Sequence, residues 1–167
     1  MLNFRHLLSL PGSLFLLILM SLTAMGQTSP LPYENSHMDT IDGISVHYRT
    51  WNASQHDPLK KIVFIHGFAG STFCFRTLYD TLVAGGWMVV AIDIPGAGYS
   101  DRTLDFNQSH GNRGRFLWKV LSAIDPADPA NWTLVGHSMG GGTAEAMAIM
   151  HPDRTDRKST RLNSSHV

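Results

Sequence analysis

The residues that most directly suggest chemistry are Gly136-His137-Ser138-Met139-Gly140, where a serine stands between glycines at the end of a short apolar run. This G-x-S-x-G spacing is typical of a nucleophile elbow, a sharp strand-to-helix turn that lifts a serine hydroxyl clear of the backbone. Such a turn strains the serine and crowds the positions two residues away, where glycine has no Cβ to clash. A glycine-rich loop between a strand and a helix is the alternative. Ser138 is thus a candidate nucleophile if its surroundings supply the turn.

The elements that would position Ser138 alternate between strands and helices. Nearly continuous apolar runs rich in β-branched residues predict strands at 61–65, 87–92 and 132–135. Apolar residues at helical spacing predict helices at 71–83, 116–124 and 143–150, and Ser71 is the expected N-cap of the first. Asp42-Gly43 predicts a hairpin turn between residues 38 and 50. We therefore expect an α/β fold, with a mostly parallel sheet and helices on both faces. Ligands bind such sheets at the carboxyl ends of the strands, where Ser138 would lie.

Three motifs occur in the order and spacing of the α/β-hydrolase superfamily: His66-Gly67-Phe68, Asp93-x-x-Gly96-x-Gly98-x-Ser100 and Gly136-x-Ser138-x-Gly140-Gly141. Residues 36–155 therefore resemble the N-terminal part of an α/β-hydrolase domain. The resemblance implies that Ser138 attacks a carbonyl carbon and that the backbone N–H groups of Met139 and Phe68 form the oxyanion hole.

A serine at this turn, where dehalogenases and epoxide hydrolases of the same fold use an aspartate, implies ester or other acyl substrates. Carbon–carbon bond hydrolases and cofactor-free haloperoxidases of this fold share the serine, so the reaction stays open at that level. A second hypothesis is a non-catalytic relative that serves as a binding module. A complete gene that supplies an acid and a histidine after Ser138 would separate the two.

Other residues near the motifs are expected to have structural roles. In the superfamily the histidine at His66 shapes the oxyanion loop, the histidine at His137 flanks the nucleophile, and the aspartate at Asp93 tethers loops at the strand ends. Cys74 is the single cysteine and lies in a predicted helix, so we expect it to be a small core residue.

The acid and the histidine of the triad should follow the serine in the chain. His151, Asp153 and His166 are of suitable type but are poor candidates. Residues 156–167 have no apolar periodicity and resemble the in-frame translation of a sequencing-library adapter. We expect this segment to be an artefactual tail and the fold to be truncated after the elbow helix, with no strand after His151-Pro152. The strand at 132–135 would then lie at an open edge, and this chain would be inactive.

The N-terminal residues 1–26 have the layout of a secretory signal peptide. Arg5 and His6 precede an uncharged apolar run, and Ala24-Met25-Gly26 supplies small residues for cleavage. An uncleaved membrane anchor is the alternative, because the uncharged stretch approaches spanning length. Residues 27–35 are a predicted linker. The globular part is expected to be exported, secreted or periplasmic, and to meet a membrane only if the anchor stays uncleaved.

Composition excludes several other classes of function. The 13 basic and 13 acidic residues balance, so there is no electrostatic basis for nucleic-acid binding. A length of 167 residues with 43% hydrophobic content suits one globular domain. One cysteine excludes a disulfide framework, and the histidines lack metal-ligand spacing. We expect no metal and no cofactor, and a small-molecule ester or acyl substrate as the partner.

Overall fold

The computed structural model describes residues 31–127 and 131–161, and for residues 157–161 it describes the backbone alone. The described residues from Tyr33 onward belong to one compact unit. The predicted signal peptide or anchor at 1–26 and most of the linker at 27–35 lie outside the described residues. Among the helices described, none is long and apolar enough to cross a bilayer.

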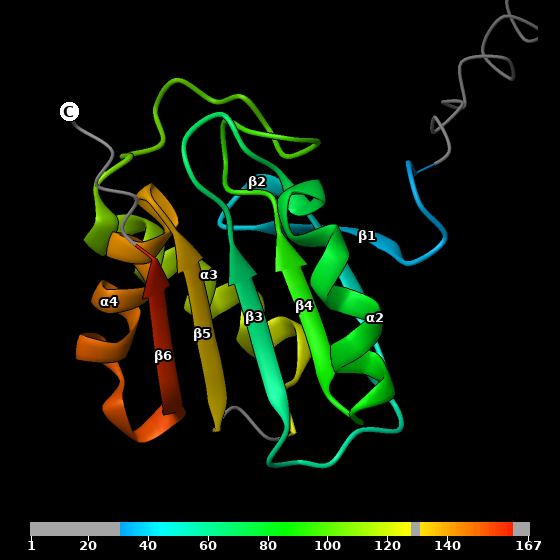
Figure 1. Cartoon of the computed structure of the whole chain (residues 1–167). Coiled ribbons are helices and arrows are strands. Elements are labelled where there is room, and N and C mark those ends of the chain that lie inside the picture. The colour runs from blue at the N-terminus through cyan, green and yellow to red at the C-terminus, as the bar shows by residue number, and fades with distance from the viewer. Residues whose placement is uncertain (1–30, 128–130, 162–167) are drawn as a thin grey trace, which may run out of the picture. The chain divides into compact units, whose positions relative to one another are not determined.

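A six-stranded sheet in the order β1-β2-β4-β3-β5-β6 forms the framework of this unit (Figure 1). Its strands are β1 (Ser36–Ile41), β2 (Ile44–Trp51), β3 (Lys61–Ile65), β4 (Met88–Ile92), β5 (Trp132–His137) and β6 (Thr155–Arg161). β1 and β2 are antiparallel to their neighbours, whereas the strands from β4 through β3 and β5 to β6 are parallel. The predicted mostly parallel sheet is therefore confirmed.

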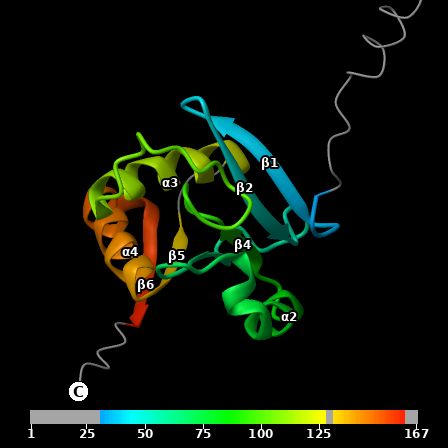
Figure 2. The ribbon, with the colours of Figure 1, turned by 90° about the horizontal axis from the view of Figure 1, so that it is seen from above.

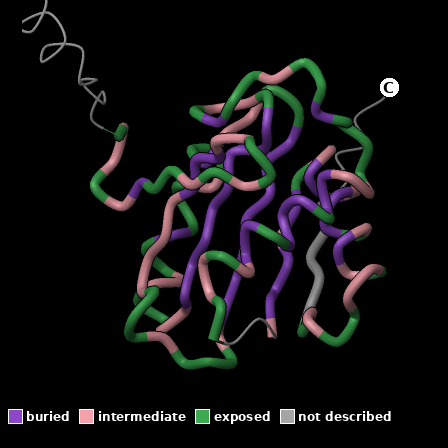
Figure 3. The backbone as a smooth tube through the Cα atoms, turned by 180° about the vertical axis from the view of Figure 1, so that it is seen from behind, coloured by how far each residue is buried: buried purple, intermediate pink, exposed green. Residues whose placement is uncertain are grey.

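Helices cover both faces of the sheet, as predicted. They are η2 (Thr72–Phe75), α2 (Arg76–Ala84), α3 (His110–Ile124), α4 (Met139–Met150) and η3 (Pro152–Arg154). Seen from above, α2 lies on one side of the strands and α3 and α4 on the other (Figure 2). One core cluster joins α3 and α4 to the sheet through residues such as Leu117 and Met147. The other packs Tyr79 of α2 against Phe64 of β3. All residues of β3 and β4 are consequently buried (Figure 3).

The turn between β1 and β2 follows directly from its two central residues. Asp42 and Gly43 both have positive φ, 51° and 79°, which is the requirement of a type I′ turn. Aspartate and glycine tolerate this region of backbone space better than other residues. The turn sets the register that pairs Ile41 with Ile44, so the hairpin forms as the sequence predicts.

Ser71 caps the first helical turn after β3, as predicted, but Cys74 is not a core residue. The Ser71 hydroxyl accepts a hydrogen bond from Phe73 N at 3.3 Å, and Cys74 Sγ accepts one from Ser71 N at 3.4 Å. These two bonds make a reciprocal capping box. The Cys74 side chain therefore turns back to the helix terminus and is exposed, so the core assignment was wrong.

Residues after His151-Pro152 form a strand, contrary to the sequence-based expectation. β6 runs parallel to β5, pairing Thr133 with Arg157 and His137 with Arg161. A β-ladder is made by backbone N–H and C=O groups, so an edge strand can form without the apolar periodicity of a buried one. β5 is therefore an inner strand, and the edge is β6. The adapter origin of residues 156–167 stays a prediction.

Candidate active site

Ser138 lies between the end of β5 and the start of α4, at the carboxyl edge of the sheet. Its backbone has φ 53° and ψ −119°, a conformation that a residue with a Cβ rarely adopts. Strain of this kind costs about 1–3 kcal/mol and persists only where the surrounding structure enforces it. The predicted strand–turn–helix around Ser138 is therefore present with a strained backbone, and the alternative of a relaxed glycine-rich loop is excluded.

Two glycines make this turn sterically possible. A Cβ at Gly136 would lie 2.2 Å from the carbonyl oxygen of Gly140, and a Cβ at Gly140 would lie 2.1 Å from the carbonyl oxygen of Ile65. Both neighbours are backbone atoms, one in the first turn of α4 and one at the end of β3, and they cannot rotate away as a side chain can. The spacing of two residues on either side of Ser138 thus has a physical cause: the start of α4 packs directly on β3 and β5.

The loop after β3 brings a second backbone segment to the serine. A Cβ at Gly67 would lie 3.2 Å from the Cβ of Ser138, so Gly67 and Phe68 pass beside the turn. Within residues 31–127 and 131–161, neither Phe68 N nor Met139 N donates to any acceptor. Gly141 N and Gly142 N, by contrast, donate to the Ser138 carbonyl oxygen. Two unengaged N–H groups therefore come from the two segments that flank Ser138.

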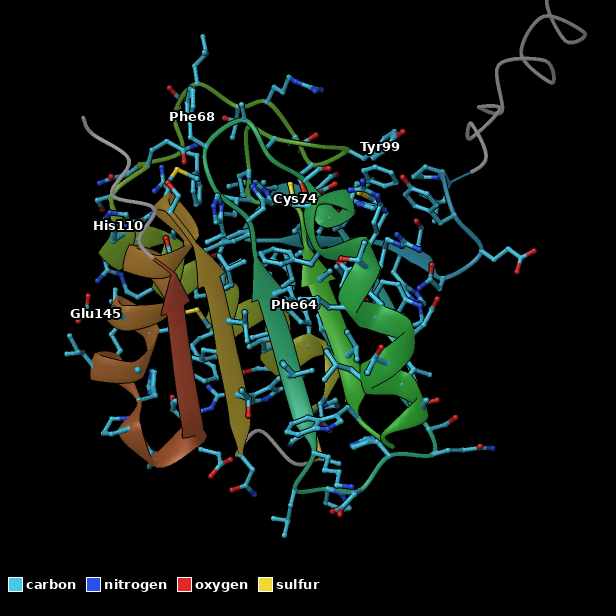
Figure 4. All side chains as sticks on the ribbon, viewed as in Figure 1. Phe64, Phe68, Cys74, Tyr99, His110 and Glu145 are labelled. Carbon is cyan, nitrogen blue, oxygen red and sulfur yellow. The ribbon has the colours of Figure 1, made fainter. Side chains whose placement is uncertain are left out.

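The side chains of the predicted oxyanion residues differ in exposure. The Phe68 side chain is 86% exposed and stands on the loops beyond the carboxyl ends of the strands (Figure 4). Met139 is half-buried at the first position of α4. The predicted chemistry uses the N–H groups of these two residues and not their side chains.

His66 joins two loops and is unsuited to act as a base. Its Nδ1 donates to the Gly67 carbonyl oxygen at 2.7 Å, and its Nε2 accepts from Ile94 N at 3.0 Å. These partners use both ring nitrogens of the neutral imidazole. Burial lowers the pKa of His66 below its ordinary value, since a buried cation loses its hydration. His66 thus ties the loop after β3 to the loop after β4, which is a structural role.

The Ser138 hydroxyl has no hydrogen-bond partner among the described side chains and backbone groups. His137, its neighbour in sequence, is exposed at the end of β5. His110, labelled in Figure 4, has Nδ1 3.3 Å from Thr143 Oγ1, one turn along α4. No described histidine or carboxylate is therefore bonded to the serine.

Asp93 anchors the loops at the end of β4 from a fully buried position. Its carboxylate accepts hydrogen bonds from Thr72 N at 2.5 Å and Tyr99 N at 3.0 Å, and lies 2.8 Å from His47 Nδ1. Burial alone raises the pKa of Asp93, but the bonds from His47, Tyr99 and Thr72 outweigh it and hold the pKa below its ordinary value. A Cβ at Gly98 would lie 2.0 Å from Asp93 Oδ2, so the glycine admits the carboxylate.

A second Ser–His–Asp arrangement surrounds this aspartate and was not anticipated from the sequence. His47 Nε2 lies 2.9 Å from Ser36 Oγ, while its Nδ1 contacts Asp93. This is the connectivity of a catalytic triad, yet His47 and Asp93 are completely buried and Ser36 is 7% exposed. No substrate carbonyl can reach such a hydroxyl. The alternation of β1 and β2 could have placed Ser36 and His47 on one face, but nothing in the sequence ties them to Asp93.

A cavity of about 510 Å³ is lined by Phe68 and Met139, the two residues with unengaged N–H groups. Its walls come from the loops after β3 and β4, from α3 and from the start of α4, and include His66, Phe68, Ile94, Gln108, Arg113 and Met139. A slightly larger hollow of about 550 Å³ between the β1–β2 turn and α3 shares none of these residues. Across the described ranges, no three His, Cys, Asp or Glu side chains are arranged to hold a metal ion.

Comparison with known proteins identifies similar chains. A sequence model for the family described as alpha/beta hydrolase fold matches residues 60–157. An uncharacterized hydrolase of Bacillus subtilis, YugF, is 29% identical over 114 residues, covering 68% of this chain and 39% of that protein. The pFDCC methylesterase MES16 of Arabidopsis thaliana is 35% identical over 100 residues, covering 59% and 37%.

A solved structure shows the same likeness. Cfl2 from Burkholderia cenocepacia matches with a TM-score of 0.66 and 27% identity, covering 75% of this chain and 40% of that one. The chain therefore spans less than half the length of each of these proteins.

Proposed function

Because this chain belongs to the alpha/beta hydrolase fold family, we propose that it is part of a serine hydrolase in which Ser138 attacks the carbonyl carbon of an ester or another acyl substrate. The observation that carries the proposal is the backbone of Ser138, held at φ 53° and ψ −119° between β5 and α4. Strain of this size at an accessible hydroxyl has a mechanistic use and no evident packing use.

In the proposed reaction, Ser138 Oγ loses its proton to a general base as it bonds to the carbonyl carbon. The carbonyl oxygen becomes an oxyanion, which the N–H groups of Phe68 and Met139 stabilise. The first turn of α4 adds its favourable dipole at the same place. Removing one such donor typically lowers the rate by about 10²–10³-fold. The alcohol then leaves with a proton, and water hydrolyses the acyl-enzyme.

We further propose that the acid and the histidine of the triad belong to a part of the full-length protein that follows these residues. The chain matches less than half of its relatives' length, which supports this view. The 167-residue chain is accordingly expected to be inactive. The exported location proposed from residues 1–26 is consistent with a hydrolase that acts on molecules outside the cytoplasm.

A fluorophosphonate probe tests the assignment, because it reacts with activated serines only. The full-length protein should be labelled, and Ser138→Ala should abolish labelling. Ser36→Ala is the matched control, since it removes the serine of the sealed arrangement and should leave labelling intact. Equal labelling of the wild type and Ser138→Ala would refute the nucleophile. A folded wild type that is not labelled at all would favour the non-catalytic binding module.

A further inference from the structure

Arg113 of α3 is a buried cation without an acidic partner. Arg113 is only 8% exposed. Within the described ranges no carboxylate forms an ion pair with it. Burial lowers the pKa of the guanidinium, and no neighbouring acid offsets that effect. Arginine is rarely buried without a counter-charge because its desolvation is costly.

A specific clamp holds this guanidinium in place. Arg113 Nε donates to Gln108 Oε1 at 2.9 Å, and Gln108 Nε2 donates to the Pro95 carbonyl oxygen at 2.9 Å. A Cβ at Gly96 would lie 3.2 Å from Gln108 Nε2, so glycine leaves room for the amide. The position of the charge is thus fixed by the loop after β4, and both polar ends of the glutamine are used.

Arg113 lies at the same cavity as the two residues of the proposed oxyanion hole. Arg113 lines this cavity of about 510 Å³ together with Phe68 and Met139. Its terminal nitrogens have no protein partner within the described residues. Among the described residues, the fully buried side-chain nitrogen and oxygen atoms without a hydrogen-bond partner are Trp132 Nε1 and Thr133 Oγ1. Because the terminal nitrogens of Arg113 are not among them, these nitrogens are not fully buried. The outer edge of the guanidinium therefore keeps some exposed surface, and the residue lines the cavity.

We propose that Arg113 binds a carboxylate of the substrate, so that the hydrolase acts on esters that carry a second, ionised carboxyl group. The inference rests on the proposed function and names its substrate class. A guanidinium presents two parallel N–H donors that match the two oxygens of a carboxylate. A bound carboxylate would also supply the counter-charge that the protein does not. Arg102 lines the same cavity but is exposed and donates to the Gly98 carbonyl oxygen, so it belongs to the rim.

Paired substrates test this subsite in the full-length protein. The p-nitrophenyl half-ester of glutaric acid carries the carboxylate, and p-nitrophenyl 5-methylhexanoate is its neutral counterpart of the same shape. Arg113→Met should lower kcat/KM for the half-ester by about 10- to 100-fold, the range for hydrogen bonds to charged groups. The loss for the neutral ester should be much smaller, since that substrate offers the guanidinium no carboxylate. Arg113→Lys should recover part of the loss, and the matched control Arg102→Met should lose little.

Equal losses for both esters in Arg113→Met, or no loss in either, would overturn the subsite. Equal losses are what a purely structural role predicts, for example if an acid elsewhere in the full-length protein pairs with Arg113. A binding measurement separates this outcome from failure of the proposed function. Monomethyl glutarate is titrated into Ser138→Ala protein by calorimetry, where binding should disappear in Ser138→Ala/Arg113→Met and persist in Ser138→Ala/Arg102→Met. If the neutral ester is hydrolysed but monomethyl glutarate does not bind, the carboxylate subsite is refuted and the proposed serine hydrolase is not.

Discussion

Replacing Asp93 by asparagine should destabilise the protein severely, although the change removes no volume. Three donors converge on this buried carboxylate: His47 Nδ1, Thr72 N and Tyr99 N. The amide of asparagine keeps one acceptor oxygen and turns an N–H₂ group toward donors. Removing one partner of a buried, charged hydrogen-bonding group costs about 3–5 kcal/mol. Total stabilities are about 5–15 kcal/mol, so the loss is a large fraction of the whole.

Asp101 provides a matched control for this substitution. It is exposed, and its carboxylate also accepts a backbone hydrogen bond, from Ser45 N at 2.7 Å. Because water can replace that bond, Asp101→Asn should cost less than about 1 kcal/mol. The midpoints of urea unfolding, followed by tryptophan fluorescence of the full-length protein, give both values. If the two variants unfold at the same urea concentration, the anchoring role of Asp93 is refuted.

The pH dependence of the same comparison has a defined sign. The pKa of Asp93 lies below its ordinary value of 3.8, so the native state releases the proton more readily than the unfolded chain. Its contribution to stability is therefore fully present above the ordinary pKa and is lost as the pH falls through the lower, native one. The stability difference between the wild type and Asp93→Asn should narrow in that acidic range. A difference that widens there would contradict the assignment.

Two further changes test the turn and the oxyanion loop. Gly140→Ala should destabilise by about 1–3 kcal/mol or prevent folding, whereas Gly111→Ala in α3, whose nearest contact would be Met150 Cε at 3.6 Å, should be neutral or stabilising in the same thermal melts. His66 has a pKa lowered from 6.5 by burial, so below 6.5 the unfolded chain takes up a proton that the native state does not, and stability falls as the pH drops toward the native pKa. Glutamine can donate and accept hydrogen bonds as the imidazole does, so His66→Gln should make the urea midpoint depend less on pH below 6.5. If the midpoint of the variant depends on pH as strongly as that of the wild type, His66 is not the cause of this pH dependence.

The elements that could be predicted from the sequence are those whose signals are local. Residues 61–65 form β3 as predicted, because a β-branched apolar run suits a strand that is buried on both faces. Asp42 and Gly43 likewise encode their own turn. Ser71 was recognised as a helix cap from its type alone, and its hydroxyl does accept the expected bond.

The start of α3 was predicted too far along the chain, and a close approach inside this helix was not predicted at all. α3 begins at His110 rather than near Phe116, since Ser109 caps it by accepting from Asn112 N at 3.3 Å. A Cβ at Gly114 would lie 3.2 Å from Met147 Cγ, so a glycine that suggests a loop in fact lets α3 and α4 pack. Such contacts between distant segments leave no trace in local propensity.

The functional residues divide along the same line. The turn at Ser138 could be predicted because it requires glycines at neighbouring positions of the sequence, Gly136 and Gly140. Arg113 was missed, because its meaning depends on Gln108, on the Pro95 carbonyl and on a cavity shared with residues 45 positions away in sequence, such as Phe68. A buried arginine is identified only when its partners can be counted in space.

Two serines of this chain differ in which features of a hydrolase site they have. Ser36 has the histidine and the carboxylate in line, but it lies on a strand and is only 7% exposed. Ser138 has neither partner among the described residues, yet it has the strained turn and two unengaged N–H groups beside a cavity. A base can be delivered to an accessible hydroxyl by a later segment of the chain. Access and an oxyanion hole cannot be added to a buried one, because both depend on how the sheet and its first helices pack. We therefore assign the proposed chemistry to Ser138, whereas His47 and Asp93 hold the strand ends and loops together.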